Sequence, residues 1–443
     1  MQGLDESPAP PSKRIPYHLL IALWMLPLVL VATAPAGAEA RDFSHPRSHR
    51  GRQCAGLERA LGVLEWTHFL DRGRWGGVFR GRREQAIRRL ARHYADRCVS
   101  LNQVQVLGTH NSYHIQPDPV LINLYVLFDE TAIQWEYTHR PLDEQFEFLG
   151  IRQIELDVYA DPMGGLYAAP FGFQLLQNDF EARIPELEAP GIKVLHVQDL
   201  DSDTTCQSLV ECLAILKGWS DARPGHLPIM ILIEAKDDLV PDPLEFGFTV
   251  PIEFGPAEFD DLDAEIRSVF PPDQIITPDD VRGGAATLDE AVQTRGWPTL
   301  SEARGRILFA LDNGGSKREA YLEGHPSLMG RVLFTSAAPG QADAAFVKVN
   351  DPLLDPERIP ELVRDGYIVR TRADADTLDA RDNDTEQRDA ALASGAQYVS
   401  TDYPEPDPAF SEYQVTLPDG APGRCNPVNA PPGCRSFALE RLD

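Results

Sequence analysis

Short apolar runs that end in polar residues recur along the chain after residue 100, and stretches with helical spacing, such as 206–222 and 385–396, lie between several of them. Continuous apolar runs are typical of strands that are buried on both faces of a parallel sheet. The alternation therefore predicts an α/β fold. We expect eight strands at 104–111, 151–159, 192–199, 229–238, 306–313, 345–351, 367–374 and 396–403. The run at 331–336 is a candidate extra strand.

Eight strand–helix repeats favour a closed TIM-type (β/α)8 barrel, because that fold uses eight parallel strands, each followed by a helix. A doubly wound open sheet is the alternative. No G-x-G-x-x-G motif opens a helix in this sequence, which argues against a dinucleotide-binding domain.

The first 40 residues have the pattern of an export signal. Lys13 and Arg14 precede an apolar run at 19–34, and Ala36-Gly37-Ala38 follows as a candidate cleavage site. A retained membrane anchor is the alternative, although the run is shorter than the roughly 20 residues of a membrane span. We expect a protein that is secreted or periplasmic after signal cleavage.

Three further segments follow the signal. Residues 41–100 form an Arg-rich extension in which Ile87, Leu90 and Tyr94 have helical spacing. The barrel is expected over 101–403, with a Pro/Asp-rich insertion at about 239–300, and a Pro-rich tail occupies 404–443. The arginines of the extension are interpreted as a solvated helical face, with contact to phospholipid headgroups as the alternative.

The charge of the chain is strongly negative and unevenly distributed. The formal net charge is −27; residues 41–100 contribute +8 and residues 101–443 contribute −34. Such an acidic body repels nucleic acid backbones, so DNA and RNA are not expected as partners. It also repels anionic membranes unless a cation or the basic extension intervenes.

Six cysteines follow the signal segment, and an even number suits a protein of an oxidising compartment. Six cysteines allow fifteen connectivities, so spacing gives only a preference. The preferred pairs are Cys206–Cys212, Cys425–Cys434 and Cys54–Cys98.

Polar side chains lie at the ends of four consecutive predicted strands. Singly, each is an ordinary turn or capping residue, but together they would meet at the carboxyl ends of the strands, where TIM barrels carry their active sites. Residues two apart on a strand face the same way, so Glu155 accompanies Asp157 and Glu234 accompanies Lys236. The strand-end set is His110, Asn111, Glu155, Asp157, His196, Glu234 and Lys236.

Four members of this set offer only oxygen ligands: Asn111, Glu155, Asp157 and Glu234. Oxygen ligands suit a hard ion such as Ca²⁺ or Mg²⁺ rather than zinc. Burying several carboxylates together is costly unless a cation joins them. The sequence therefore predicts a metal site, and the two histidines remain for proton transfer and charge stabilisation.

The order and spacing of these motifs resemble the calcium-dependent phosphoinositide-specific phospholipase C family, and its compact bacterial members most closely. The resemblance spans roughly residues 100–403. It rests on THN at 109–111, ELD at 155–157, VLHVQD at 194–199 and LIEAKDD at 232–238.

The resemblance implies an enzyme with the barrel of the phospholipase C-like phosphodiesterases and with Ca²⁺ as cofactor. The calcium ligands would be Asn111, Glu155, Asp157 and Glu234. His110 and His196 would be catalytic, with Glu155 or Glu234 as the base. Lys236 and Arg372 are candidates to hold the phosphate. Arg370 and Arg372 share one face of their strand, and the alternative for both is that they form ion pairs within the acidic body.

The expected reaction is cleavage of phosphatidylinositol or a related phosphodiester on the glycerol side. A glycerophosphodiester phosphodiesterase is the first alternative, because IEAKDD and the late TRAD…ASGAQYVSTDY resemble that pattern, whereas His110-Asn111 departs from its His-Arg opening. The second alternative is a non-catalytic exported barrel that binds calcium or lipid. The expected partners are a phospholipid or glycerophosphodiester substrate and a membrane surface in peripheral contact, and a monomer is expected.

A further histidine, His114, lies four residues after His110. Only one of the two can lie at the strand mouth with Asn111, and Gly108-Thr109 places His110 there. His114 is therefore interpreted as a rim or packing residue.

Overall fold

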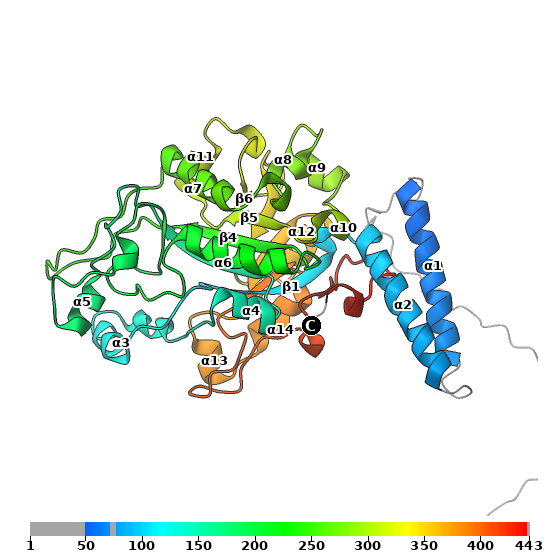
Figure 1. Cartoon of the computed structure of the whole chain (residues 1–443), viewed down its shortest axis with the longest axis horizontal. Coiled ribbons are helices and arrows are strands. Elements are labelled where there is room, and N and C mark those ends of the chain that lie inside the picture. The colour runs from blue at the N-terminus through cyan, green and yellow to red at the C-terminus, as the bar shows by residue number, and fades with distance from the viewer. Residues whose placement is uncertain (1–48, 71–76, 441–443) are drawn as a thin grey trace, which may run out of the picture. The chain divides into compact units, whose positions relative to one another are not determined.

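The computed structural model describes residues 49–70 and 77–440, so the predicted signal at 1–40 lies outside the described residues. The described chain contains a closed barrel of eight parallel strands with helices around it (Figure 1). The predicted barrel is therefore confirmed, and the open-sheet alternative is wrong. The barrel strands are β1 (Val104–Thr109), β2 (Gln153–Tyr159), β4 (Ile229–Ala235), β5 (Ile307–Leu311), β6 (Leu333–Ser336), β7 (Ala344–Lys348), β8 (Ile368–Arg372) and β9 (Tyr398–Thr401).

One predicted barrel strand is wrong. The run 192–199 contributes only β3 (Lys193–Val194), which pairs antiparallel with the end of β2 and lies outside the barrel. The eighth place is taken by β6, which falls on the candidate extra strand at 331–336. His196 therefore comes from a loop and not from the carboxyl end of a barrel strand.

The barrel closes between its first two strands through the pair Gly108 and Gln153. A Cβ atom on Gly108 would lie 1.8 Å from Oε1 of Gln153, so a larger residue could not be accommodated without moving that side chain. The glycine in the VLGTHN sequence thus allows β1 and β2 to approach where the sheet closes.

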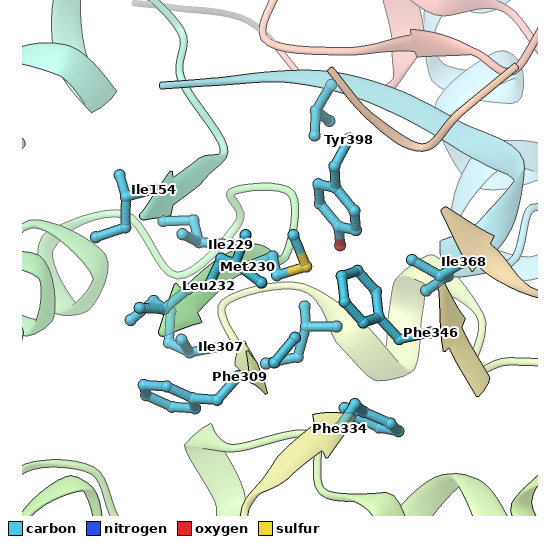
Figure 2. Close-up of a cluster of buried hydrophobic side chains, with 14 of the residues drawn as sticks. Ile154, Ile229, Met230, Leu232, Ile307, Phe309, Phe334, Phe346, Ile368 and Tyr398 are labelled. Atoms are coloured by element: carbon cyan, nitrogen blue, oxygen red, sulfur yellow. The ribbon is translucent and has the colours of Figure 1, made fainter. Parts of the chain in front are cut away.

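The interior of the barrel is filled by apolar side chains from its strands. Figure 2 shows Met230 of β4, Phe346 of β7 and Tyr398 of β9 pointing toward one another. All three are at most 2 % exposed. A packed interior is usual for eight strands, and the barrel therefore holds its polar side chains at one end and not in a central pore.

Fourteen α-helices accompany the strands in the described part of the chain. The segment 239–300 is not one long loop, because it includes α7, α8, α9 and the start of α10. The helices are α1 (His49–Leu70), α2 (Gly77–Cys98), α3 (Pro119–Tyr125), α4 (Leu142–Phe148), α5 (Phe171–Gln177), α6 (Leu209–Ala222), α7 (Pro256–Val269), α8 (Pro278–Arg282), α9 (Leu288–Thr294), α10 (Leu300–Ala303), α11 (Gly315–Leu322), α12 (Arg358–Arg364), α13 (Leu378–Asp382) and α14 (Glu386–Ser394).

The Arg-rich extension contains α1 and α2, which pack against each other. Of the three residues with helical spacing, Ile87 and Tyr94 are buried and Leu90 is half-buried. The three preferred disulfides are the ones that form, and no cysteine is free: Cys54–Cys98, Cys206–Cys212 and Cys425–Cys434. Disulfides of this number are typical of proteins outside the cytoplasm. Within residues 49–70 and 77–440, no helix has the length and apolar character needed to cross a membrane.

The C-terminal segment packs against the amino ends of the barrel strands. Strand β10 (Arg424–Cys425) pairs antiparallel with the start of β1. Arg152, which precedes β2, is 1 % exposed, and its Nε atom donates a hydrogen bond of 3.1 Å to Oε2 of Glu440. The same carboxylate accepts a 2.6 Å hydrogen bond from the backbone amide of Leu227, just before β4.

Candidate active site

His110 follows directly after β1 and is held by groups from β8 and β9. Its Nδ1 atom lies 2.9 Å from Oδ1 of Asp402, and Nη2 of Arg372 lies 3.5 Å from the same Nδ1. Its backbone carbonyl accepts a 2.8 Å hydrogen bond from Nε2 of His139. Burial and the Arg372 guanidinium lower the pKa of His110 to about 3, against the opposing effect of Asp402. The ring is therefore neutral at pH 7 before substrate binds.

Asn111 occupies the turn after His110, with a φ of 42°. Asparagine tolerates this left-handed conformation better than most residues. Its side chain is buried, and its Oδ1 atom has no hydrogen-bond partner among the described residues. A buried amide oxygen without a partner is costly unless a ligand satisfies it.

Glu155, Asp157 and Glu234 form an acidic cluster beside Asn111 and His110. Asp157 and Glu234 are direct neighbours in the β2–β4 register, and Glu155 shares a face of β2 with Asp157. Each of the three carboxylates offers an oxygen that lies within 4.8 Å of the others. Nε2 of His110 is 3.9 Å from Oε1 of Glu155, so the histidine adjoins the cluster.

Two cations compensate part of this charge. Nη2 of Arg370 donates a 2.5 Å hydrogen bond to Oε2 of Glu155. Nζ of Lys236 lies 3.4 Å from Oδ2 of Asp157 and 3.8 Å from Oε1 of Glu234. The two cations nevertheless leave the cluster short of positive charge.

Burial raises the pKa of Glu155 to about 7 even though Arg370 is adjacent. Burial likewise raises the pKa of Asp157 well above its usual range despite Lys236. Both oxygens of Asp157 lack a hydrogen-bond partner within the described chain. Two carboxylates that resist ionisation, together with buried oxygens that nothing satisfies, are the features expected where a cation is missing.

His196 lies in the loop after β3 and belongs to a second group of titratable side chains. Its Nδ1 atom is 2.7 Å from Oδ2 of Asp201, and Nε2 of His114 is 2.8 Å from the same oxygen. Burial lowers the pKa of His196, although Asp201 opposes the shift. His114 is fully buried, so the interpretation of it as a rim residue is wrong.

The structure brings the predicted site residues together at the carboxyl end of the barrel. Arg370 and Arg372 both form the ion pairs that were their alternative interpretation, with Glu155 and Asp402 respectively, and Arg372 also contacts His110. Sequence reasoning missed Asp402, Asp201 and Asp312, the last of which adds negative charge near Glu155 and Asp157 and helps to raise their pKa values. Asp402 and Asp312 follow the ends of β9 and β5, so the strand-end pattern could have found them; Asp201 lies in a loop and gives no local signal.

The donor set fits a calcium ion. It comprises the amide of Asn111 and the carboxylates of Glu155, Asp157 and Glu234. All but Glu234 are buried, and the side-chain oxygens of Asn111 and Asp157 accept no hydrogen bond from the described residues. Calcium takes six to eight oxygen ligands, and neutral amide oxygens accompany carboxylates in its sites. No nitrogen or sulfur ligand belongs to this cluster of the described chain, which disfavours zinc.

Oxygen ligands at the mouth of a parallel barrel, with imidazoles facing the same space, suit the metal-assisted cleavage of phosphate esters. Residues 99–427 match the model of the family described as Phosphoinositide phospholipase C, Ca2+-dependent, and the chain belongs to that family. It is therefore an enzyme, a phosphodiesterase of the phospholipase C type, and Ca²⁺ is the cofactor of its family. The alternative of a non-catalytic barrel is wrong.

Solved structures of bacterial enzymes are similar to the chain. A Ca²⁺-dependent phosphatidylinositol-specific phospholipase C from Streptomyces antibioticus is 19% identical, with a TM-score of 0.42 over 69% of this chain and 96% of that one. The apo form of a calcium-dependent phosphoinositol-specific phospholipase C from a Gram-negative Pseudomonas species is 18% identical, with a TM-score of 0.43 over 75% of this chain and 96% of that one. No curated protein matches the sequence.

Proposed function

We propose that the protein is exported and cleaves phosphatidylinositol, or a closely related phosphodiester, on the glycerol side of its phosphate. The observation that carries this proposal is the set of unsatisfied buried oxygens on Asn111 and Asp157, which adjoins two histidines of different surroundings. A calcium ion held by Asn111, Glu155, Asp157 and Glu234 would supply positive charge that acidifies a hydroxyl of the substrate and attracts its phosphate.

The side chains then divide the reaction between them. A hydroxyl of the headgroup loses its proton and attacks phosphorus, while the bond from phosphorus to the glycerol oxygen breaks. We assign the proton acceptor to Glu234, because its side chain is 29 % exposed, whereas Glu155 is 3 % exposed and held by Arg370. Once it is protonated on both ring nitrogens, His196 gives the Nε2 proton to the departing glycerol oxygen, a role that suits an imidazolium.

His110 and the basic residues act on the phosphate. His110 stabilises the charge that develops on the phosphoryl oxygens. Arg372 and Lys236 hold the phosphate, and their partial exposure of 16 % and 19 % leaves them accessible to it. A bound phosphate would oppose the Arg372 charge at His110, which favours the protonated ring that can donate from Nε2.

Peripheral contact with a membrane is supported by exposed apolar side chains on the loops that follow barrel strands. Leu121 and Tyr125 of α3 pack with Leu175 of α5, so the loops after β1 and β2 lie side by side. Exposed apolar side chains clustered around a site are typical of lipid-contacting surfaces. Those on these loops and on the loops after β4, β7 and β8 are Val120, Leu127, Phe128, Met163, Phe180, Leu239, Leu244, Phe246, Val250, Leu354 and Leu378.

The decisive experiment is an activity assay of the purified protein on matched substrates. Phosphatidylinositol vesicles should be cleaved to diacylglycerol, and a chelator should abolish the reaction until calcium is restored. Phosphatidylcholine vesicles serve as the control for the headgroup. Cleavage of glycerophosphoinositol without cleavage of phosphatidylinositol would replace the proposal with a glycerophosphodiester phosphodiesterase.

A further inference from the structure

Beside the calcium cluster, His114, Asp201 and His196 form a chain of hydrogen bonds. Oδ2 of Asp201 lies 2.8 Å from Nε2 of His114 and 2.7 Å from Nδ1 of His196. His114 and Asp201 are at most 1 % exposed, whereas the His196 side chain is 15 % exposed. One carboxylate oxygen therefore joins a fully buried histidine to one that reaches solvent.

The acceptors in this chain fix where the protons lie. Nδ1 of His114 is 3.0 Å from the carbonyl oxygen of Tyr137, and a carbonyl only accepts. Its Nε2 faces the Asp201 carboxylate, which also only accepts. His114 therefore donates from both ring nitrogens, and His196 donates from Nδ1.

Only Nε2 of His196 is then left to meet a substrate. This atom makes no hydrogen bond to the described residues, and the ring is flanked edge-on by Trp135 and His114, with ring centres 5.7 Å and 5.3 Å away. The aromatic contacts limit the tilt of the ring, and the Asp201 contact selects its tautomer.

The same three side chains could in principle hold a metal. The distances argue against it, because ligand atoms around a tetrahedral zinc lie ~3.3 Å apart, as follows from metal–ligand bonds of about 2.0–2.1 Å. The nitrogen–oxygen distances of 2.7 and 2.8 Å are those of direct hydrogen bonds.

We propose that His114 is a positioning residue for the reaction: it anchors Oδ2 of Asp201, and Asp201 in turn holds His196 with Nε2 directed at the leaving oxygen. This inference rests on the proposed role of His196 as proton donor. The other oxygen of Asp201, Oδ1, has no hydrogen-bond partner within the described chain. Without His114, the buried carboxylate would keep only its bond to His196, and it would be free to rotate and to change the tautomer of that ring.

Two substitutions separate this role from simple packing. His114→Gln places an amide nitrogen near the position of Nε2 and can keep the hydrogen bond to Asp201. His114→Asn places one near Nδ1 and can keep only the bond to the Tyr137 carbonyl. Both remove the ring from its contact with Tyr137, whose ring centre is 4.4 Å away, so they share any cost that is purely structural.

The test compares both variants with the full-length wild-type enzyme in calcium. We expect His114→Asn to lower kcat on phosphatidylinositol by about 10- to 100-fold with little change in KM, a range below that for removing a proton donor outright. His114→Gln should stay within about threefold of wild type. An aryl phosphodiester of inositol, whose leaving group needs no protonation, should restore His114→Asn.

Nitrogen NMR of the histidine rings gives a readout that does not depend on turnover. At a pH where the ring is neutral, His196 should carry its proton on Nδ1 in wild type and His114→Gln, which leaves Nε2 free to take up the proton that it later donates, and it should populate both tautomers in His114→Asn. Equal kcat and equal tautomer populations in both variants would overturn the inference, as would equal loss in both. If wild type does not cleave phosphatidylinositol, the proposed function fails, and the NMR comparison still decides whether His114 positions His196.

Discussion

Nδ1 of His110 lies 2.9 Å from Oδ1 of Asp402, which joins the ends of two strands that are far apart in the sequence. The contact follows from the parallel register of β1 and β9, in which Thr109 pairs with Thr401. His110 and Asp402 are the residues that follow this pair. Burial alone would raise the pKa of Asp402, but His110 and Arg372 hold this pKa below its usual range. The carboxylate therefore stays ionised, and it fixes the proton of His110 on Nδ1.

Asp402→Asn should lower kcat by roughly 10²–10⁴-fold, because the amide can donate to Nδ1 and select the wrong tautomer of His110. Steady-state kinetics on phosphatidylinositol measures the change, and KM should vary much less. Asp273→Asn, on an exposed residue at the opposite end of the barrel strands, is the matched control. A kcat equal to that of wild type would show that Asp402 has no part in catalysis.

Asp157→Asn should weaken calcium binding and leave the fold intact, since it removes a charge at constant volume. Isothermal titration calorimetry would give the calcium affinity, and circular dichroism would check the fold. The melting temperature without calcium should change little, because the substitution removes a costly buried carboxylate together with its 3.4 Å ion pair to Lys236. Unchanged calcium affinity would place the ion elsewhere.

His110→Ala and His196→Ala should each lower turnover of phosphatidylinositol by about 10²–10⁴-fold. Their responses to a better leaving group should differ. An aryl leaving group needs little protonation, so it should rescue His196→Ala in part, whereas His110→Ala acts on the phosphoryl oxygens and should not recover. Rescue of His110→Ala alone would reverse the two assignments.

Leu127→Ser and Phe128→Ser should reduce activity on phosphatidylinositol vesicles and spare a soluble, short-chain substrate. The two side chains are 79% and 68% exposed, so their replacement removes apolar surface without disturbing the core. Vesicle sedimentation should show binding weakened by roughly 10- to 100-fold per side chain, since transfer of a large apolar side chain from water contributes about 1.5–3 kcal/mol. Val63→Ser on α1, at a similarly exposed position, should leave vesicle activity unchanged.

The protein denatured without reductant should show no titratable thiol, because all six cysteines are paired. Cys54→Ser with Cys98→Ser should lower the stability of the α1–α2 hairpin. The lost bridge spans 44 residues, and the entropy of closing such a loop corresponds to about 4 kcal/mol. The rate of proteolysis in the α1–α2 hairpin, compared between wild type and the double variant, would measure this loss of stability. An unchanged cleavage rate would contradict the prediction.

Much of the fold could be predicted because barrel strands are buried on both faces and leave continuous apolar runs. The same signal misplaced one strand. The run around Lys193 is as apolar as a barrel strand, but it lies outside the barrel, and the shorter run ending at Ser336 takes its place. Composition does not distinguish these cases, because the choice depends on which neighbour each run pairs with.

The position of a site residue at the end of a strand could be predicted from the sequence, whereas the distant partner that it contacts could not. Glu155 and Asp157 follow from spacing along one strand. Asp402 becomes a partner of His110 only through a pairing across 292 residues, and Asp201 reaches His114 across 87. Neither separation leaves a periodic pattern in the sequence.

The hydrogen bonds between Arg152 and Glu440 impose an order on the biosynthesis of this enzyme. Arg152 leaves the ribosome 288 residues before Glu440, so their hydrogen bonds cannot form until the end of synthesis. In the same way, β1 cannot pair with β9 until β9 has been synthesised. Until then, the first half of the barrel exposes unpaired strand edges and the guanidinium of Arg152 without its carboxylate partner. Nascent chains of this protein should therefore depend on chaperones or on delayed folding, since long-range pairing of parallel strands is slow and prone to aggregation.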